Sequence, residues 1–127
     1  MAVVVDTSQW VQYFRIGASA EAAEVDRLLA LGEVVMVGVV YAELLCGARD
    51  ETQFRALDEQ LDALPFFEMT NSIWRDTGRI LSDLQRRGLT IPPPDAAIAA
   101  LALEHGLQVY TRDDHFQRIP GLELHTA

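Results

Sequence analysis

The chain has 127 residues, of which 50% are hydrophobic and 23% charged, a composition that excludes a disordered protein and fits one globular domain over residues 1–127. The net charge of −9 argues against broad binding of nucleic acid by the whole surface, because neutralising phosphates needs a positive field. All ten basic residues are arginines, which excludes mechanisms that need a lysine, such as a phosphate-loop lysine or a Schiff base.

The first half of the chain predicts short apolar strands that alternate with helices. Val3, Val4 and Val5 form an apolar run typical of a buried strand, and Thr7 and Ser8 can cap the helix that follows. The predicted elements here are strands over 3–5 and 34–37 and helices over 9–15, 20–31, 39–48 and 51–64.

A triple proline at residues 92–94 separates two helical patterns in the second half of the chain. Apolar strands that alternate with helices indicate a parallel sheet covered on both faces. We therefore expect an α/β fold with three layers, α/β/α, around a central and mostly parallel sheet. The remaining predicted elements are helices from 70 or 71 to about 87 and over 95–105, a helical turn over 114–118, and strands over 66–69, 107–110 and, at an edge, 122–124.

The sequence carries no sign of a targeting or membrane-spanning segment. Its N-terminal apolar run is cut off by Asp6, and no window approaches the roughly 20 apolar residues of a membrane span. A single cysteine, Cys46, allows no disulfide within the chain, which suits a reducing cytoplasm. We expect a cytoplasmic protein, with Cys46 as a buried and inert thiol in an apolar run.

Four acids follow strands or open helices where a parallel sheet binds its ligands, beyond the carboxyl ends of its strands. Asp6 directly follows the first strand, and Asp113 comes three residues after the end of the strand over 107–110. Asp95 opens the helix after the prolines, and Glu43 lies one turn into the helix after the second strand. All four can converge on one end of the sheet.

Acids that converge in this way favour a divalent cation, because neighbouring like charges cannot all stay ionised without compensation. Oxygen ligands suit Mg²⁺ and Mn²⁺, and the chain has no cysteine and histidine set for structural zinc. Such an ion lowers the pKa of a bound water and stabilises charge on a phosphoryl group.

Each acid taken alone also has a structural explanation. Asp6 and Asp95 can be helix caps, and Asp113 can be a turn acid beside Asp114. Glu43 can be a solvated helix acid. The functional interpretation therefore depends on the four acids together.

Four motifs carry a resemblance to a known family. They are Val4-Val5-Asp6-Thr7-Ser8, Glu43 with Leu44 and Gly47, Pro94-Asp95-Ala96-Ala97-Ile98-Ala99-Ala100, and Thr111-Arg112-Asp113-Asp114-His115-Phe116. In this order, across nearly the whole chain, they resemble a PIN domain and, within that family, the VapC-type ribonuclease toxins of prokaryotic toxin–antitoxin pairs.

The resemblance implies a compact α/β/α domain that cuts RNA with Mg²⁺ or Mn²⁺. It implies Asp6, Asp95 and Asp113 as metal ligands around an activated water that attacks an RNA phosphodiester, with Glu43 as an acid that holds this water or assists its deprotonation. Ser8 and Thr111 match positions that orient the carboxylates, although a helix cap and a strand-end hydroxyl explain them equally well.

Other positions are less defined by the pattern. Arg112 flanks the expected site and is the best single candidate for gripping the RNA backbone. Family members often carry a further acid two places after the position of Asp113, where this chain has His115 beside Asp114. Either residue can tune the site, or His115 can simply face solvent.

The resemblance also implies protein partners. It implies a homodimer and a cognate antitoxin that lies across the early helices, where Trp10, Tyr13 and Phe14 form an aromatic cluster. We expect at least one of these three side chains in the core, while an exposed one would anchor the antitoxin.

Two rival functions remain open at this stage. One is a phosphotransfer domain with Asp6 as an aspartyl nucleophile, although such sites normally also need a lysine, which this chain lacks. The other is a PIN-like scaffold that has lost activity and only binds protein. The presence of all four acids weighs against that second rival.

Overall fold

The computed structural model describes residues 1–15 and 19–127. The elements run in the order β1 (Val3–Val5), α1 (Thr7–Phe14), α2 (Ala20–Ala30), β2 (Val34–Val37), α3 (Gly38–Cys46), α4 (Glu51–Asp62), β3 (Phe66–Phe67), α5 (Asn71–Arg86), α6 (Pro93–His105), β4 (Gln108–Tyr110) and the 3-10 helix η1 (Asp114–Arg118). Within these described residues no helix is long and apolar enough to cross a membrane.

Four parallel strands form one sheet in the order β3-β2-β1-β4. The central strand β1 pairs Val3 with Val34 of β2 and Val5 with Tyr110 of β4. Strands β1 and β2 are buried along their whole length, as expected for a parallel sheet with helices on both faces. The expected parallel α/β fold is confirmed.

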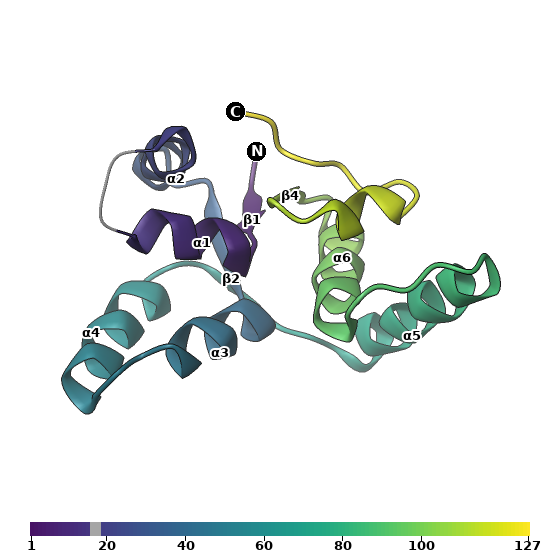
Figure 1. The fold of residues 1–127 in the computed structure, drawn as a ribbon, viewed down its shortest axis with the longest axis horizontal. Helices are drawn as coiled ribbons and strands as arrows, with labels where there is room; N and C mark the ends of the chain where they lie inside the picture. Colours follow the sequence, from purple (N-terminus) through teal and green to yellow (C-terminus); the bar gives the residue numbers. More distant parts are fainter. Residues whose placement is uncertain (16–18) are drawn as a thin grey trace.

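The helices lie on both sides of this sheet. Figure 1 shows α1 and α2 on one side of the strands and α5 and α6 on the other, which gives three layers. Because β1 leads into α1 and β2 into α3, both helices begin at the carboxyl end of the sheet. Helix α6 begins at the same end, because Asp95 in its first turn contacts His115 of η1, which follows the carboxyl end of β4.

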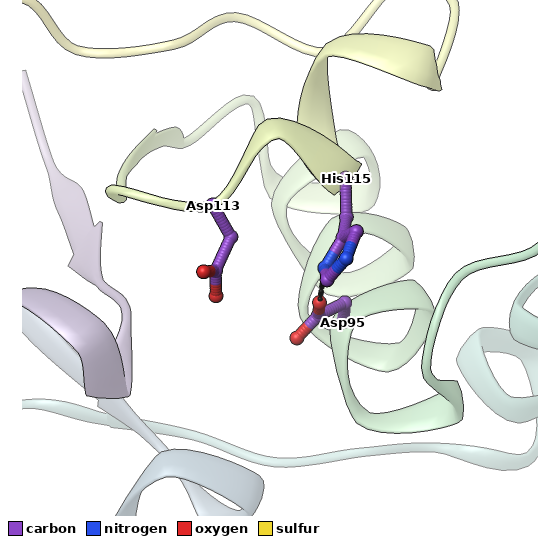
Figure 2. Close-up of side chains that lie close together, drawn as sticks. All are labelled: Asp95, Asp113 and His115. Atoms are coloured by element: carbon purple, nitrogen blue, oxygen red, sulfur yellow. Dashed lines mark hydrogen bonds and ion pairs between the residues drawn. The ribbon is translucent and has the colours of Figure 1, made fainter.

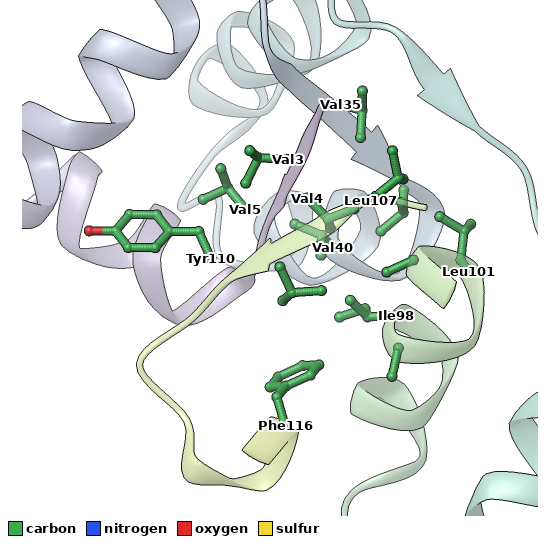
Figure 3. Packing of buried hydrophobic residues seen from close by; sticks show 14 of the residues in the cluster. Val3, Val4, Val5, Val35, Val40, Ile98, Leu101, Leu107, Tyr110 and Phe116 are labelled. Atoms are coloured by element: carbon green, nitrogen blue, oxygen red, sulfur yellow. The ribbon is translucent and has the colours of Figure 1, made fainter. Parts of the chain in front are cut away.

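Helix α6 is the centre of the core on its side of the sheet. All eight residues from Asp95 to Ala102 are buried, since small alanines let the helix approach both the sheet and α5. Ile98 and Leu101 face the strands, and Phe116 of η1 closes the same cluster (Figure 3). The buried Phe116 therefore fixes η1 against α6.

Three local expectations differ from the structure. The strand expected over 66–69 extends only over Phe66–Phe67. The edge strand expected over 122–124 is reduced to a single parallel bridge between Val109 and Leu124. Cys46 was expected to be buried but is exposed at the end of α3.

Candidate metal centre

Asp6 lies at the carboxyl end of β1, where its position is fixed by backbone and side-chain hydrogen bonds. Its backbone N–H donates to the carbonyl oxygen of Tyr110 at 2.9 Å, which joins the ends of β1 and β4. The hydroxyls of Ser8 and Thr111 each donate to Oδ2 of Asp6 at 2.9 Å. With only 2% of its surface exposed, the Asp6 carboxylate is buried and held from two sides.

Asp95 lies in the first turn of α6. Proline at the start of a helix costs no hydrogen bond, so the Pro92-Pro93-Pro94 run fixes the backbone that enters this turn. The Asp95 side chain is largely buried, and its Oδ2 lies 2.8 Å from Nδ1 of His115 in η1. The carboxylate therefore has one defined partner and one oxygen left for another.

Asp113 reaches the same place from the segment between β4 and η1. Its backbone N–H donates to Oγ1 of Thr111 at 3.0 Å, so Thr111 positions both Asp6 and Asp113. One ligand atom from each of Asp95, Asp113 and His115 lies within 4.8 Å of the others. Figure 2 shows the Asp113 carboxylate pointing into the space that Asp95 and His115 border.

Burial and mutual repulsion disfavour the charged forms of these acids. Burial raises the pKa of Asp6 most strongly, the Thr111 and Ser8 hydroxyls partly offset this, and the charge of Asp113 raises it further. Burial also raises the pKa of Asp95, against the hydrogen bond from His115, and the charges of Asp6 and Asp113 add to the rise. At both acids, burial and the neighbouring carboxylates outweigh the contacts that favour the charged form.

The structural explanations of these acids as helix caps do not hold. Asp6 and Asp113 occupy the N-cap positions of α1 and η1, yet neither side chain makes a capping hydrogen bond. Asp95 lies inside its helix, with Pro92 at the cap position. Asp95 and Asp113 instead share a cluster with His115, and Asp6 is close enough for its charge to act on Asp95.

Glu43 is not part of this cluster. It is exposed on α3 and accepts a hydrogen bond of 3.0 Å from the hydroxyl of Thr7, the residue after Asp6. This contact places Glu43 at the rim of the acidic site, beside Thr7, which directly follows the buried Asp6.

Arg112 is also at the rim. Its backbone N–H donates to Oγ of Ser8 at 3.1 Å, while its side chain is 44% exposed. The guanidinium Nη1 lies 4.0 Å from Oε1 of Glu21 on α2. The charged head is therefore only loosely held and can reorient toward a ligand.

His115 is the residue whose place the sequence left open. The structure puts it in the cluster, whereas its neighbour Asp114 is exposed. The available signal was the motif itself, because His115 directly precedes Phe116, whose apolar ring had to enter the core and so directs the start of η1 inward.

Comparisons with known proteins agree with this fold. The sequence matches the PIN domain family over residues 3–122. Ribonuclease VapC11 of Mycobacterium tuberculosis is 35% identical over 121 residues, covering 92% of this chain and 90% of its own length.

Solved structures support the same grouping. VapBC-1 from nontypeable Haemophilus influenzae has a TM-score of 0.81 at 26% identity, covering 98% of this chain and 97% of its own. DNA-bound VapBC from Salmonella typhimurium has a TM-score of 0.82 at 22% identity with the same coverage, a likeness of fold. The chain belongs to the PIN domain family and, within it, to the VapC group.

Proposed function

We propose that this chain is a metal-dependent endoribonuclease and the toxin of a VapBC-type toxin–antitoxin pair. The observation that carries the proposal is the meeting of Asp95, Asp113 and His115 beside the buried Asp6, a cluster in which burial and neighbouring carboxylates raise the pKa of Asp6 and Asp95. The VapC relatives, which are ribonucleases by name, support the reaction class.

The donor set fits a hard divalent cation. Carboxylate oxygens are the ligands that Mg²⁺ and Mn²⁺ prefer, and a dication removes the repulsion that raises the pKa of Asp6 and Asp95. Asp6, Asp95 and Asp113 would hold the ion. When bound, it would supply Lewis-acid activation of water and of a phosphodiester.

The other residues of the site prepare this chemistry. Ser8 and Thr111 orient the carboxylate of Asp6, so that its second oxygen is directed away from the two hydroxyls. Glu43, fixed by Thr7 at the rim, accepts a proton from the attacking water. The exposed guanidinium of Arg112 binds the phosphate of the RNA backbone, a contact for which arginine is well suited.

The burial of Asp6 argues against the rival aspartyl-nucleophile function. One of its oxygens already accepts two hydrogen bonds and the side chain is 2% exposed, so in-line attack on a phosphorus atom has no access. The site suits a ligand role instead.

The Asp6→Asn substitution tests the proposal. An amide removes the charge but can still accept the Ser8 and Thr111 hydrogen bonds, so the variant should fold normally and lose RNA cleavage by at least about a hundredfold. Cleavage of a mixed RNA pool with and without Mn²⁺, with mapped ends, gives the readout. Asp62→Asn, which changes an exposed acid at the end of α4, is the matched control and should cut normally. If Asp6→Asn cuts as well as wild type, the assignment is wrong.

The antitoxin would bind beside this site. A groove of about 440 Å³ runs between α1, α3 and α4, and Thr7 and Glu43 line it together with the apolar Val11 and Phe14. Trp10 is buried while Phe14 is 42% exposed, so one aromatic residue of the cluster belongs to the core and another is free to anchor a partner. VapBC and other toxin–antitoxin complexes among the solved relatives support such a partner.

Two further features complete the proposal. The toxin would act as a homodimer, as the family resemblance implies, and light scattering of the purified chain would measure this. It would act in the cytoplasm, where its single cysteine stays reduced and RNA is present.

A further inference from the structure

One side chain of the cluster does not match an all-oxygen site. His115 offers an imidazole nitrogen next to the carboxylates of Asp95 and Asp113. The ring is held in place rather than free, because Nδ1 contacts Asp95 and the next residue, Phe116, is 1% exposed in the core. A nitrogen donor is therefore built into the site.

The distances fit coordination as well as a hydrogen bond. Two ligands that each lie about 2.1 Å from one ion are about 3.0 Å apart when they are at right angles, and about 4.2 Å apart when they are opposite. Nδ1 of His115 lies 2.8 Å from Oδ2 of Asp95, and all three donor atoms lie within 4.8 Å of one another. The contact between His115 and Asp95 thus matches two neighbouring ligands of one ion, and a side-chain movement of under about 1 Å brings any pair at the 4.8 Å bound into range.

We propose that His115 is a nitrogen ligand that makes this site select first-row transition-metal dications, with Mn²⁺ as the probe, over Mg²⁺. Magnesium strongly prefers oxygen ligands, whereas the affinity of a site with a nitrogen ligand rises along the first-row dications from Mn²⁺ to Cu²⁺, so Mn²⁺ is the most stringent probe of the series. The inference rests on the proposed metal site and specifies its ion. Among the described histidines, His105 lies at the far end of α6 against Phe67, and His125 bonds to Glu24 and Gln108, so His115 alone serves the cluster.

Binding of Mn²⁺ and Mg²⁺, each measured by calorimetry on the full chain, tests the selectivity. His115→Ala should weaken Mn²⁺ binding by about tenfold or more and change Mg²⁺ binding much less. His115→Asp should restore oxygen ligands and shift the Mn²⁺ to Mg²⁺ preference toward Mg²⁺. His105→Ala, an exposed histidine outside the cluster, is the matched control and should bind both ions as wild type does.

Pulsed electron paramagnetic resonance of the Mn²⁺-loaded protein gives a readout that does not depend on activity. Wild type and His105→Ala should show coupling of Mn²⁺ to a ¹⁴N nucleus, and both His115 variants should lack it. Stoichiometric Mn²⁺ binding without ¹⁴N coupling, or an ion preference unchanged in His115→Ala, would overturn the role of His115 and leave the nuclease proposal standing. If wild type binds no Mn²⁺, the metal site and this inference fail together.

Discussion

Asp6 shows what the site demands of a single residue. Its carboxylate is buried and lies near the charges of Asp95 and Asp113, and two hydroxyls only partly compensate. Function needs the ionised carboxylate, while the metal-free fold is more stable with the neutral acid. The conflict is typical of functional sites, where local stability is given up for reactivity.

This conflict predicts a pH dependence of metal-free stability. The pKa of Asp6 in the folded state is raised above 3.8, so its contribution to stability is full below pH 3.8 and is lost as the pH rises through the folded pKa. In EDTA, Asp6→Asn should match wild type at low pH and become more stable than wild type toward neutral pH. Added Mn²⁺ should reverse the order by stabilising wild type alone.

Thermal unfolding of both proteins between pH 3.5 and 7 would measure the effect, with the range chosen as roughly spanning the titration of a raised carboxyl group. Glu24, whose pKa is lowered mainly by Arg27, changes stability in the opposite sense, but it is common to both proteins and cancels in the difference. If the difference in stability between the two proteins stays constant across this pH range, ionisation of Asp6 does not destabilise the metal-free fold.

At the residue scale, the sequence predicted the positions of the three aspartates better than the positions of His115 and Cys46. Asp6, Asp95 and Asp113 follow from strand ends and a proline-led helix, which are local features. The place of His115 depends on how η1 docks on α6, a tertiary contact for which the apolar Phe116 beside it is the one local signal. Cys46 was misjudged from its apolar neighbours. It lies two residues beyond the buried Leu44, which turns it about 200° around α3 and out to solvent.

At the scale of elements, α6 is the support of the site. It brings Asp95 to the carboxyl end of the sheet, and it ends at Gly106, which has a left-handed φ of 65°. The following strand, β4, carries the chain back toward Thr111 and Asp113. Helix α6 thus positions Asp95 directly and Asp113 through the chain reversal at Gly106.

A pair of glycine substitutions tests this view of the helix ends. Gly106→Ala should lower the free energy of unfolding by about 1–2 kcal/mol, because an L-residue resists the left-handed conformation. Gly78→Ala in the middle of α5 should instead raise it by about 0.5–1 kcal/mol through helix propensity. In both cases the added Cβ meets no atom within 4 Å, so conformation alone decides the sign. Urea denaturation measures both, and equal effects would contradict the argument.

Most elements were predictable because their apolar patterns are long or fully buried. The exceptions lie at the sheet edges, where β3 has only two residues and the segment before the C-terminus forms one bridge. Edge pairing depends on contacts with distant segments. The alternating Leu-Glu-Leu pattern of residues 122–124 therefore could not define how many residues pair.

At the scale of the whole molecule, the C-terminal segment fastens the sheet to α2. His125 lies 3.1 Å from Oε2 of the buried Glu24 and 3.1 Å from Oε1 of Gln108, and its ring meets the edge of Tyr110. Arg27 holds the same glutamate. This network covers the outer edge of β4, the strand that leads into Thr111.

Loss of this contact should destabilise the fold without acting on the metal site. His125→Ala removes the contacts to the buried Glu24, which keeps Arg27, and to the half-buried Gln108, and should lower the free energy of unfolding by about 1–3 kcal/mol. Thr126→Ala, at an exposed neighbouring position, should change it little. Urea denaturation with and without Mn²⁺ separates stability from metal binding. An unchanged midpoint for His125→Ala would show that the C-terminal segment does not stabilise the fold through His125.

The most direct test of the account is anomalous diffraction at the manganese edge from crystals grown with Mn²⁺. The account predicts one strong anomalous peak enclosed by Asp95, Asp113 and His115 and close to Asp6. If saturating Mn²⁺ leaves this position without a peak, or places the ion on another surface, the shared-cation site does not exist and the nuclease proposal loses its foundation.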